Sequence, residues 1–126
     1  NMRLASPGAT DEDIWLALDR AQIGEAVRAW PDGLGTMLGE SGARLSGGEA
    51  RRIAVAQAIL RATPWLILDE GTAGLDAVTE QRLLDALDTL PHRPTLLHLA
   101  HRRAPLARAR RIFRMERGRI VPCRPP

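Results

Sequence analysis

The N-terminal half of the chain has its hydrophobic and polar positions spaced as in helices. The segment Thr10–Ala21 opens with a residue that can cap a helix, followed by three acids that the helix dipole favours. Its apolar residues share one face, namely Ile14, Leu18 and Ala21. A short second helix is predicted for residues 22–30, then a glycine-rich loop over residues 31–48. The next predicted helix extends from Glu49 to Arg61.

The C-terminal half alternates short apolar runs with an amphipathic segment. Trp65–Leu68 is predicted to be a strand buried on both faces, and Thr95–Leu99 a second strand. Between them, residues 78–90 are predicted to be a helix. Its inward side chains are Leu83, Leu84, Leu87 and Leu90. A short helix is predicted after Pro105, and the turn at residues 116–118 predicts a terminal hairpin.

This order of elements predicts an α/β fold with parallel strands. Residues 1–61 are expected to form a helical subdomain, and residues 62–126 the C-terminal part of a parallel-sheet core. The two strands and the hairpin make only a small sheet, whose edges and faces need covering. We therefore expect the domain to be truncated, with further segments preceding Asn1.

Composition is typical of a soluble globular chain, at 44% hydrophobic and 26% charged residues. All 18 basic residues are arginine, so these residues contain no phosphate-binding loop of the form GxxxxGK[ST]. No apolar run approaches the roughly 18 residues of a membrane helix, and no signal-peptide pattern is present. The single cysteine, Cys123, cannot form an internal disulfide, which favours a reducing compartment.

Charge is divided unevenly along the chain. Residues 1–90 carry 8 arginines and 14 acids, a net charge of −6, whereas residues 91–126 carry 10 arginines and one acid, a net charge of +9. A basic C-terminal third is compatible with nucleic acid or anionic lipid as a partner. The simpler interpretation, a solvated arginine-rich edge, is favoured, and composition leaves the other open.

Two segments have the residues of a phosphate and cation site. Leu45-Ser46-Gly47-Gly48-Glu49 lies directly before a predicted helix, where backbone N–H groups and the helix dipole favour an anion. The alternative is an ordinary glycine-rich loop with a serine cap. Asp69 and Glu70 follow a predicted strand, at the end where open α/β sheets bind ligands. One carboxylate can hold Mg²⁺ through water and the other can act on a water molecule, or both can be solvated acids of a turn.

The remaining candidates are polar residues near the ends of the same elements. His101 follows the second strand and could donate a hydrogen bond to a phosphate. His98 and His92 are better explained by packing or exposure. Asp76, in the loop that leaves the carboxylate pair, would by itself be a helix cap.

Taken together, these segments resemble the ATPase domain of ATP-binding cassette (ABC) proteins, which has a P-loop NTPase fold. Residues 45–49 resemble the signature motif and residues 66–70 the Walker B strand with its catalytic glutamate. Residues 74–76 resemble the D-loop, and residues 100–102 the switch-histidine segment. The resemblance covers only the C-terminal part of the family's domain, so the Walker A loop is expected upstream of Asn1.

The resemblance implies a composite site in which two domains pair head to tail around two ATP molecules. Ser46, Gly47, Gly48 and Glu49 would contact ATP held by the partner domain. At the other site, Asp69 would organise Mg²⁺ through water, Glu70 would act on the attacking water and His101 would contact the γ-phosphate. Asp76 would contact the partner across the interface.

A narrower similarity is to ABC exporters, and within them to the CydC-type subunit of the heterodimeric thiol (cysteine/glutathione) exporter needed for cytochrome bd assembly. Residues 39–42 resemble the exporters' X-loop, where Glu40 would couple to the membrane domain. This implies a heterodimer, an upstream transmembrane domain in the same chain, the cytoplasmic face of the bacterial inner membrane and no nucleic-acid partner. The 126 residues alone are then expected to be inactive.

Three residues depart from the family pattern. Gly71 replaces the usual proline after the glutamate, Gln57 replaces a common arginine, and Glu49 replaces the commoner glutamine. Two other functions stay open at this stage. One is a soluble ABC-type ATPase that acts on nucleic acid or ribosomes, and the other is a non-catalytic partner that completes another subunit's site.

Overall fold

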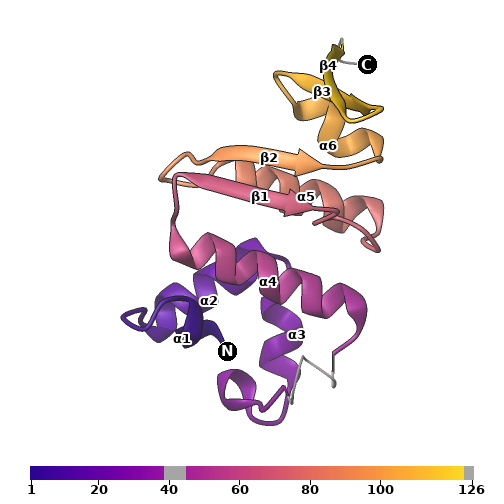
Figure 1. Cartoon of the computed structure of the whole chain (residues 1–126). Helices are drawn as coiled ribbons and strands as arrows, with labels where there is room; N and C mark the ends of the chain where they lie inside the picture. The colour runs from indigo at the N-terminus through magenta and orange to yellow at the C-terminus, as the bar shows by residue number, and fades with distance from the viewer. Residues whose placement is uncertain (39–44, 124–126) are drawn as a thin grey trace.

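The computed structural model describes residues 1–38 and 45–123 of the chain. A helical N-terminal half leads into a strand–helix–strand unit and then a hairpin (Figure 1). The elements in chain order are α1 (Met2–Ala5), α2 (Asp11–Arg20), α3 (Gly24–Ala29), the 3-10 turn η1 (Gly33–Gly35), α4 (Gly47–Arg61), β1 (Trp65–Asp69), α5 (Ala77–Asp88), β2 (Thr95–Leu99), α6 (Arg103–Arg108), β3 (Ile112–Glu116) and β4 (Arg119–Cys123).

Two helices of the N-terminal half begin with the same capping chemistry. The Thr10 hydroxyl accepts a hydrogen bond from the backbone N–H of Asp13, whose carboxylate accepts one from the backbone N–H of Thr10. Ser46 and Glu49 make the same reciprocal pair at the start of α4. Each box satisfies N–H groups that a helix start otherwise leaves without partners. The α2 cap confirms the prediction, whereas α4 begins at Gly47, two residues before the predicted Glu49.

One hydrophobic core joins the helices to the sheet. It contains three of the four predicted inward leucines, all almost fully buried: Leu83 and Leu87 of α5, and Leu90 just beyond that helix. Helix α4 lies between the N-terminal helices and β1 (Figure 1), and its buried residues are Ile53, Val55, Ala56 and Ile59. Leu66 and Leu68 of β1 close the core from the sheet side. The core therefore fixes the strand ends relative to the start of α4.

Strands β1 and β2 are parallel and in register from Trp65 opposite Thr95 to Asp69 opposite Leu99. Helix α5 connects them and covers one face of the pair (Figure 1). This arrangement brings the carboxyl ends of both strands to one edge of the sheet, as parallel pairing requires. Residues that follow the two strands are consequently neighbours.

Burial of β1 on both faces was predicted and is wrong. Its side chains alternate, with Leu66 and Leu68 buried and with Trp65 and Ile67 each 62% exposed. Leu97 and Leu99 of β2 are also exposed. Only α5 and α4 cover this pair of strands in the described residues, so one face meets solvent.

The hairpin is confirmed, but it forms a sheet of its own. Strands β3 and β4 pair antiparallel with each other, and β1 pairs with β2. Arg117 and Gly118 both have positive φ, which matches the right-handed twist of a tight hairpin. A single small sheet was therefore a wrong expectation. Within residues 1–38 and 45–123, no helix combines the length and apolar character needed to span a bilayer.

Candidate functional site

The carboxyl ends of β1 and β2 hold the two predicted acids. Asp69 is the last residue of β1 and Glu70 follows it. The backbone N–H of Glu70 donates to the Leu99 carbonyl at 2.9 Å, and Glu70 has a φ of 49°. A left-handed conformation is uncommon for a residue other than glycine and turns the chain sharply out of the strand. The direction of the Glu70 side chain is therefore set by its own backbone conformation and by the hydrogen bond to Leu99.

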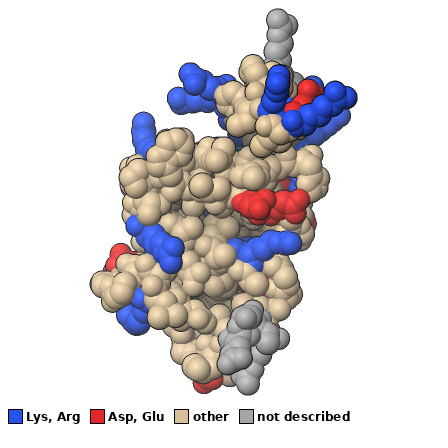
Figure 2. Space-filling view, in the orientation of Figure 1, with Lys and Arg blue, Asp and Glu red and all other residues tan. Residues whose placement is uncertain are grey.

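His101 lies against Glu70, as its position after β2 predicts. The distance from His101 Nδ1 to Glu70 Oε1 is 3.3 Å, and the two side chains are 74% and 49% exposed. This contact crosses from one strand end to the other, so it depends on the parallel register. Both groups remain open to a ligand, and Figure 2 shows acidic side chains gathered on the surface near the end of β1.

His98 differs from His101 in its surroundings. It lies in the middle of β2, half-buried, and this burial lowers the pKa of its imidazole from 6.5. The nearby charge of Asp88 opposes the shift. His98 is therefore part of the packing and His92 is exposed in the turn before β2, as predicted.

The donor set at this edge fits Mg²⁺ only as a partial shell. Among the described residues, no group of three or more His, Cys, Asp or Glu side chains could enclose a metal ion. Mg²⁺ commonly keeps several waters and takes one or two carboxylates together with substrate phosphates. Asp69 satisfies that limited requirement, because it ends β1 with an exposed carboxylate.

Asp76 is the N-cap of α5. Its Oδ1 accepts hydrogen bonds from the backbone N–H groups of Val78 and Thr79, both at 3.0 Å. Its Oδ2 accepts one from the Thr79 hydroxyl at 2.6 Å. These bonds, those from Thr79 foremost, lower the pKa of Asp76. The carboxylate therefore anchors the loop that leaves Glu70.

Ser46 lies exposed at the N-terminus of α4, with Gly47 exposed beside it. The Ser46 hydroxyl donates to Glu49 Oε2 at 2.7 Å, and the same oxygen accepts from the Ser46 backbone N–H at 2.8 Å. These bonds lower the pKa of Glu49 and keep its charge beside the hydroxyl. The dipole and free N–H groups of a 15-residue helix favour an anion at this end. Glu40 lies outside the described residues.

Gly71 lies in close contact with β1. A Cβ at this position would be 3.2 Å from Leu68 Cβ and 3.2 Å from Leu68 Cδ2. The glycine therefore lets the chain turn close over Leu68.

Arg102 is the residue at this edge to which the sequence assigned no role. Its guanidinium reaches the loop after Glu70, where it contacts the carbonyls of Thr72 and Leu75 and the buried carboxylate of Glu80. An arginine directly after His101 was visible in the sequence, but nothing local pointed to Glu80 as its partner.

The family is shown by comparison with known proteins. The model described as "ABC transporter" matches residues 8–73, more than half of the chain. The chain belongs to the ABC transporter family. This confirms the predicted fold class, that of the ABC ATPase domain with its P-loop NTPase fold.

Relatives of known name agree with this assignment to the ABC transporter family. The ATP-dependent lipid A-core flippase of Thiobacillus denitrificans is 47% identical over 113 residues, which is 90% of this chain and 20% of that protein. The mycobactin import ATP-binding/permease protein IrtB of Mycobacterium tuberculosis is 40% identical over 121 residues, 96% of this chain and 21% of that protein.

A solved structure gives the same result for the fold. A bacterial Atm1-family ABC exporter with ATP bound matches with a TM-score of 0.87 and 32% identity, covering 95% of this chain and 21% of that one. The chain spans about a fifth of the length of these relatives.

Proposed function

We propose that this chain is the C-terminal part of the ATP-hydrolysing domain of an ABC exporter, with a helical subdomain at residues 1–61 and the end of the catalytic core at residues 62–126. The observation that supports this best is the contact between His101 and Glu70 at 3.3 Å, beside Asp69 at the joined ends of two parallel strands. An acid and a histidine held open to solvent at a sheet edge are suited to phosphoryl transfer to water, which needs positioning and charge neutralisation above all.

In this proposal each residue has one task. Glu70 accepts a proton from the attacking water, and His101 contacts the γ-phosphate while it orients Glu70. Asp69 holds Mg²⁺ through water, and the cation supplies charge neutralisation at the phosphates when bound. Transfer to water breaks the bond between the γ-phosphorus and the bridging oxygen, forms a bond to the water oxygen, and leaves ADP and phosphate.

A second nucleotide would be shared with a partner ATPase domain. Ser46, Gly47 and Gly48 would contact the γ-phosphate of ATP held by that partner, with Glu49 in the same nucleotide-binding segment, and Asp76 would face the partner across the interface. The exposed Ser46 hydroxyl and the free N–H groups at the start of α4 support this assignment. Glu40 would couple the domain to a transmembrane domain.

A transport function is favoured over a nucleic-acid function by the relatives, which are a lipid flippase, a mycobactin import protein and an ABC exporter, and two of these three favour export. Under this proposal the complete protein carries a transmembrane domain, and its ATPase domain faces the cytoplasm at the inner membrane. Within this class we propose a CydC-type subunit of a heterodimer that exports thiols for cytochrome bd assembly. The residues that support it are the run 38–52, which includes the signature segment, together with residues 73–76 and residues 1–5.

The test is Glu70→Gln in the complete protein with its partner. We expect ATP to remain bound while hydrolysis at this chain's own site stops, because the amide cannot take the proton. The matched control is Glu25→Gln, which removes an exposed acid from α3, away from the strand ends. Measured with single-turnover hydrolysis, normal turnover in the Glu70 variant would contradict the proposal.

A further inference from the structure

Arg102 connects the segment after β2 to the loop at residues 72–75 and to the start of α5, which come much earlier in the sequence. Its Nη1 donates to the Thr72 carbonyl at 2.9 Å and to the Leu75 carbonyl at 3.3 Å. Its Nη2 lies 3.1 Å from Glu80 Oε2 in the first turn of α5. One side chain thus holds the loop between Glu70 and Asp76 against the helix that follows, while its own backbone continues from His101.

Losing the contact between Arg102 and Glu80 would destabilise the fold, because the Glu80 carboxylate is buried. Its side chain is only 5% exposed, and Arg102 is the cation paired with it in the described residues. Its Oε1 has no hydrogen-bond partner in the same part of the chain. A buried carboxylate without a counter-charge is strongly unfavourable, so Glu80 holds the guanidinium in place. The planar fork of arginine can meet the carboxylate and two carbonyls at once, which an ammonium group cannot.

We propose that Arg102 is a positioning residue for hydrolysis. By fixing residues 72–75 relative to His101, it sets where Glu70 and Asp76 stand when nucleotide is bound. The inference rests on the proposed function, since it assigns Arg102 a role at the same site. It adds that the buried Glu80 acts only through Arg102, and that neither residue touches the nucleotide.

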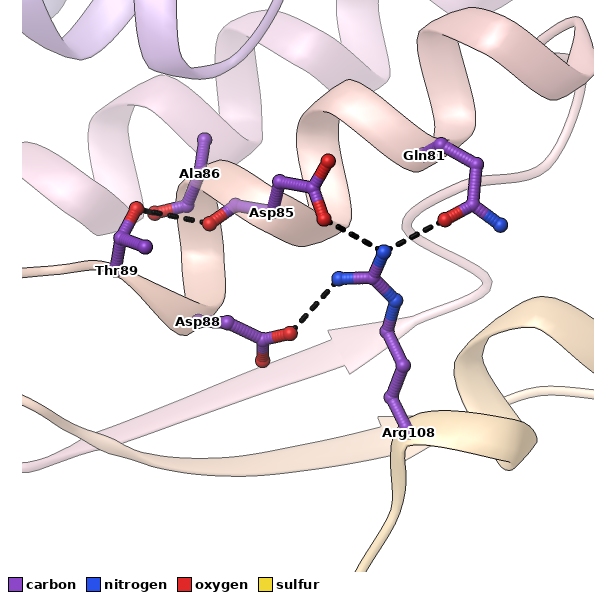
Figure 3. Close-up of polar contacts among 6 residues, drawn as sticks. All are labelled: Gln81, Asp85, Ala86, Asp88, Thr89 and Arg108. Atoms are coloured by element: carbon purple, nitrogen blue, oxygen red, sulfur yellow. Dashed lines mark hydrogen bonds and ion pairs between the residues drawn. The ribbon is translucent and has the colours of Figure 1, made fainter.

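Arg102 is the N-cap residue of α6, and an arginine inside that helix provides a matched control. Arg108, at the other end of α6, also binds α5 (Figure 3). It contacts Asp88 at 2.8 Å, Gln81 at 2.6 Å and Asp85 at 2.6 Å. Both arginines therefore tie α6 to α5 by several bonds, but only Arg102 reaches the loop beside Glu70. If Arg102 merely joined the two helices, Arg108→Gln would have the same effect.

The experiment compares variants of the complete protein in steady-state ATPase assays. Arg102→Gln leaves the buried Glu80 carboxylate without its counter-charge, which by itself lowers the stability of the fold. The decisive variant is therefore the double substitution Arg102→Gln with Glu80→Gln. We expect the double variant to keep a thermal midpoint close to wild type, with kcat lowered about tenfold and KM for ATP within about twofold. Arg102→Lys should be intermediate, and Arg108→Gln should keep kcat within about twofold of wild type.

Two results would overturn the inference. One is a double variant whose kcat equals that of Arg108→Gln, and the other is a kcat that recovers together with stability when Glu80→Gln is added to Arg102→Gln. The Glu70→Gln variant, run in parallel, sets the turnover that the partner's site contributes. If that variant keeps full turnover, the proposed function fails. If it loses turnover while the double variant does not, only the role of Arg102 fails.

Discussion

Replacing Glu49 by glutamine should strengthen nucleotide binding at the partner's site. In the free chain the Ser46 hydroxyl has one proton to donate, and it donates it to the Glu49 carboxylate at 2.7 Å. A phosphate that takes this proton displaces the carboxylate and then stands beside its charge. Glutamine keeps an acceptor for the capping box but removes that charge.

The size of the effect follows from the geometry. Two oxygens that share one hydroxyl at about 2.7 Å each lie roughly 4.5 Å apart, so repulsion per unit charge is about 1 kcal/mol at the dielectric constant of water. A hydrogen bond to a neutral acceptor is also weaker by about 1 kcal/mol than one to a charged group, which frees the hydroxyl. Glu49→Gln should therefore tighten binding by about 1–2 kcal/mol, roughly fivefold to 30-fold. Removing a favourable charge from the helix start should meanwhile destabilise α4 slightly, by about 0.3–1 kcal/mol.

The measurement is equilibrium titration of the complete protein with a non-hydrolysable ATP analogue. Because the Glu49 pKa is held below 4.5, the gain should be constant at every pH well above that value. Asp13→Asn is the control, since Thr10 and Asp13 form the same capping box on α2 and it should leave affinity unchanged. Unchanged or weaker binding in the Glu49 variant would refute the reasoning.

Three further predictions concern other residues or the whole chain. Ser46→Arg should block hydrolysis at the partner's site by placing bulk at the phosphate position, and normal nucleotide trapping there would refute it. The purified 126-residue chain should show no Mg²⁺-dependent ATP turnover, and clear turnover would contradict this. Titration of His98, whose folded pKa is lowered by burial, should leave stability unchanged above pH 6.5 and should lower stability as pH falls from 6.5 toward the folded pKa. Thermal midpoints should lose this pH dependence in His98→Leu, and an unchanged slope would exclude His98 as its source.

Local chemistry made much of the fold predictable. The helix start at Thr10, the inward leucines of α5 and the strand Thr95–Leu99 all depend on residues within a few positions of each other. The signature and Walker B segments were recognisable for the same reason. The start of α4 was predicted too late, because the glycine pair Gly47-Gly48 was assigned to the loop. In the structure Ser46 is the N-cap and both glycines belong to the first turn of the helix.

Features that depend on contacts between residues far apart in the sequence could not be predicted. An apolar run such as Trp65–Leu68 does not reveal whether one face or two are covered, and the structure covers one. Glu70, with its left-handed φ, donates its backbone N–H to Leu99 on the neighbouring strand, and Arg102 pairs with Glu80 far from it in the sequence. The contacts that hold the predicted site residues in place could therefore not be read from the sequence.

The solvent-exposed apolar face of the β1–β2 pair affects the solubility of this chain. A tryptophan, an isoleucine and two leucines stand there in water, and such patches attract one another. At high protein concentration the 126-residue chain will self-associate and precipitate, whereas at low concentration it will remain in solution longer. Salts that are excluded from protein surfaces, such as sulfate, will accelerate this aggregation because they strengthen the attraction between apolar surfaces.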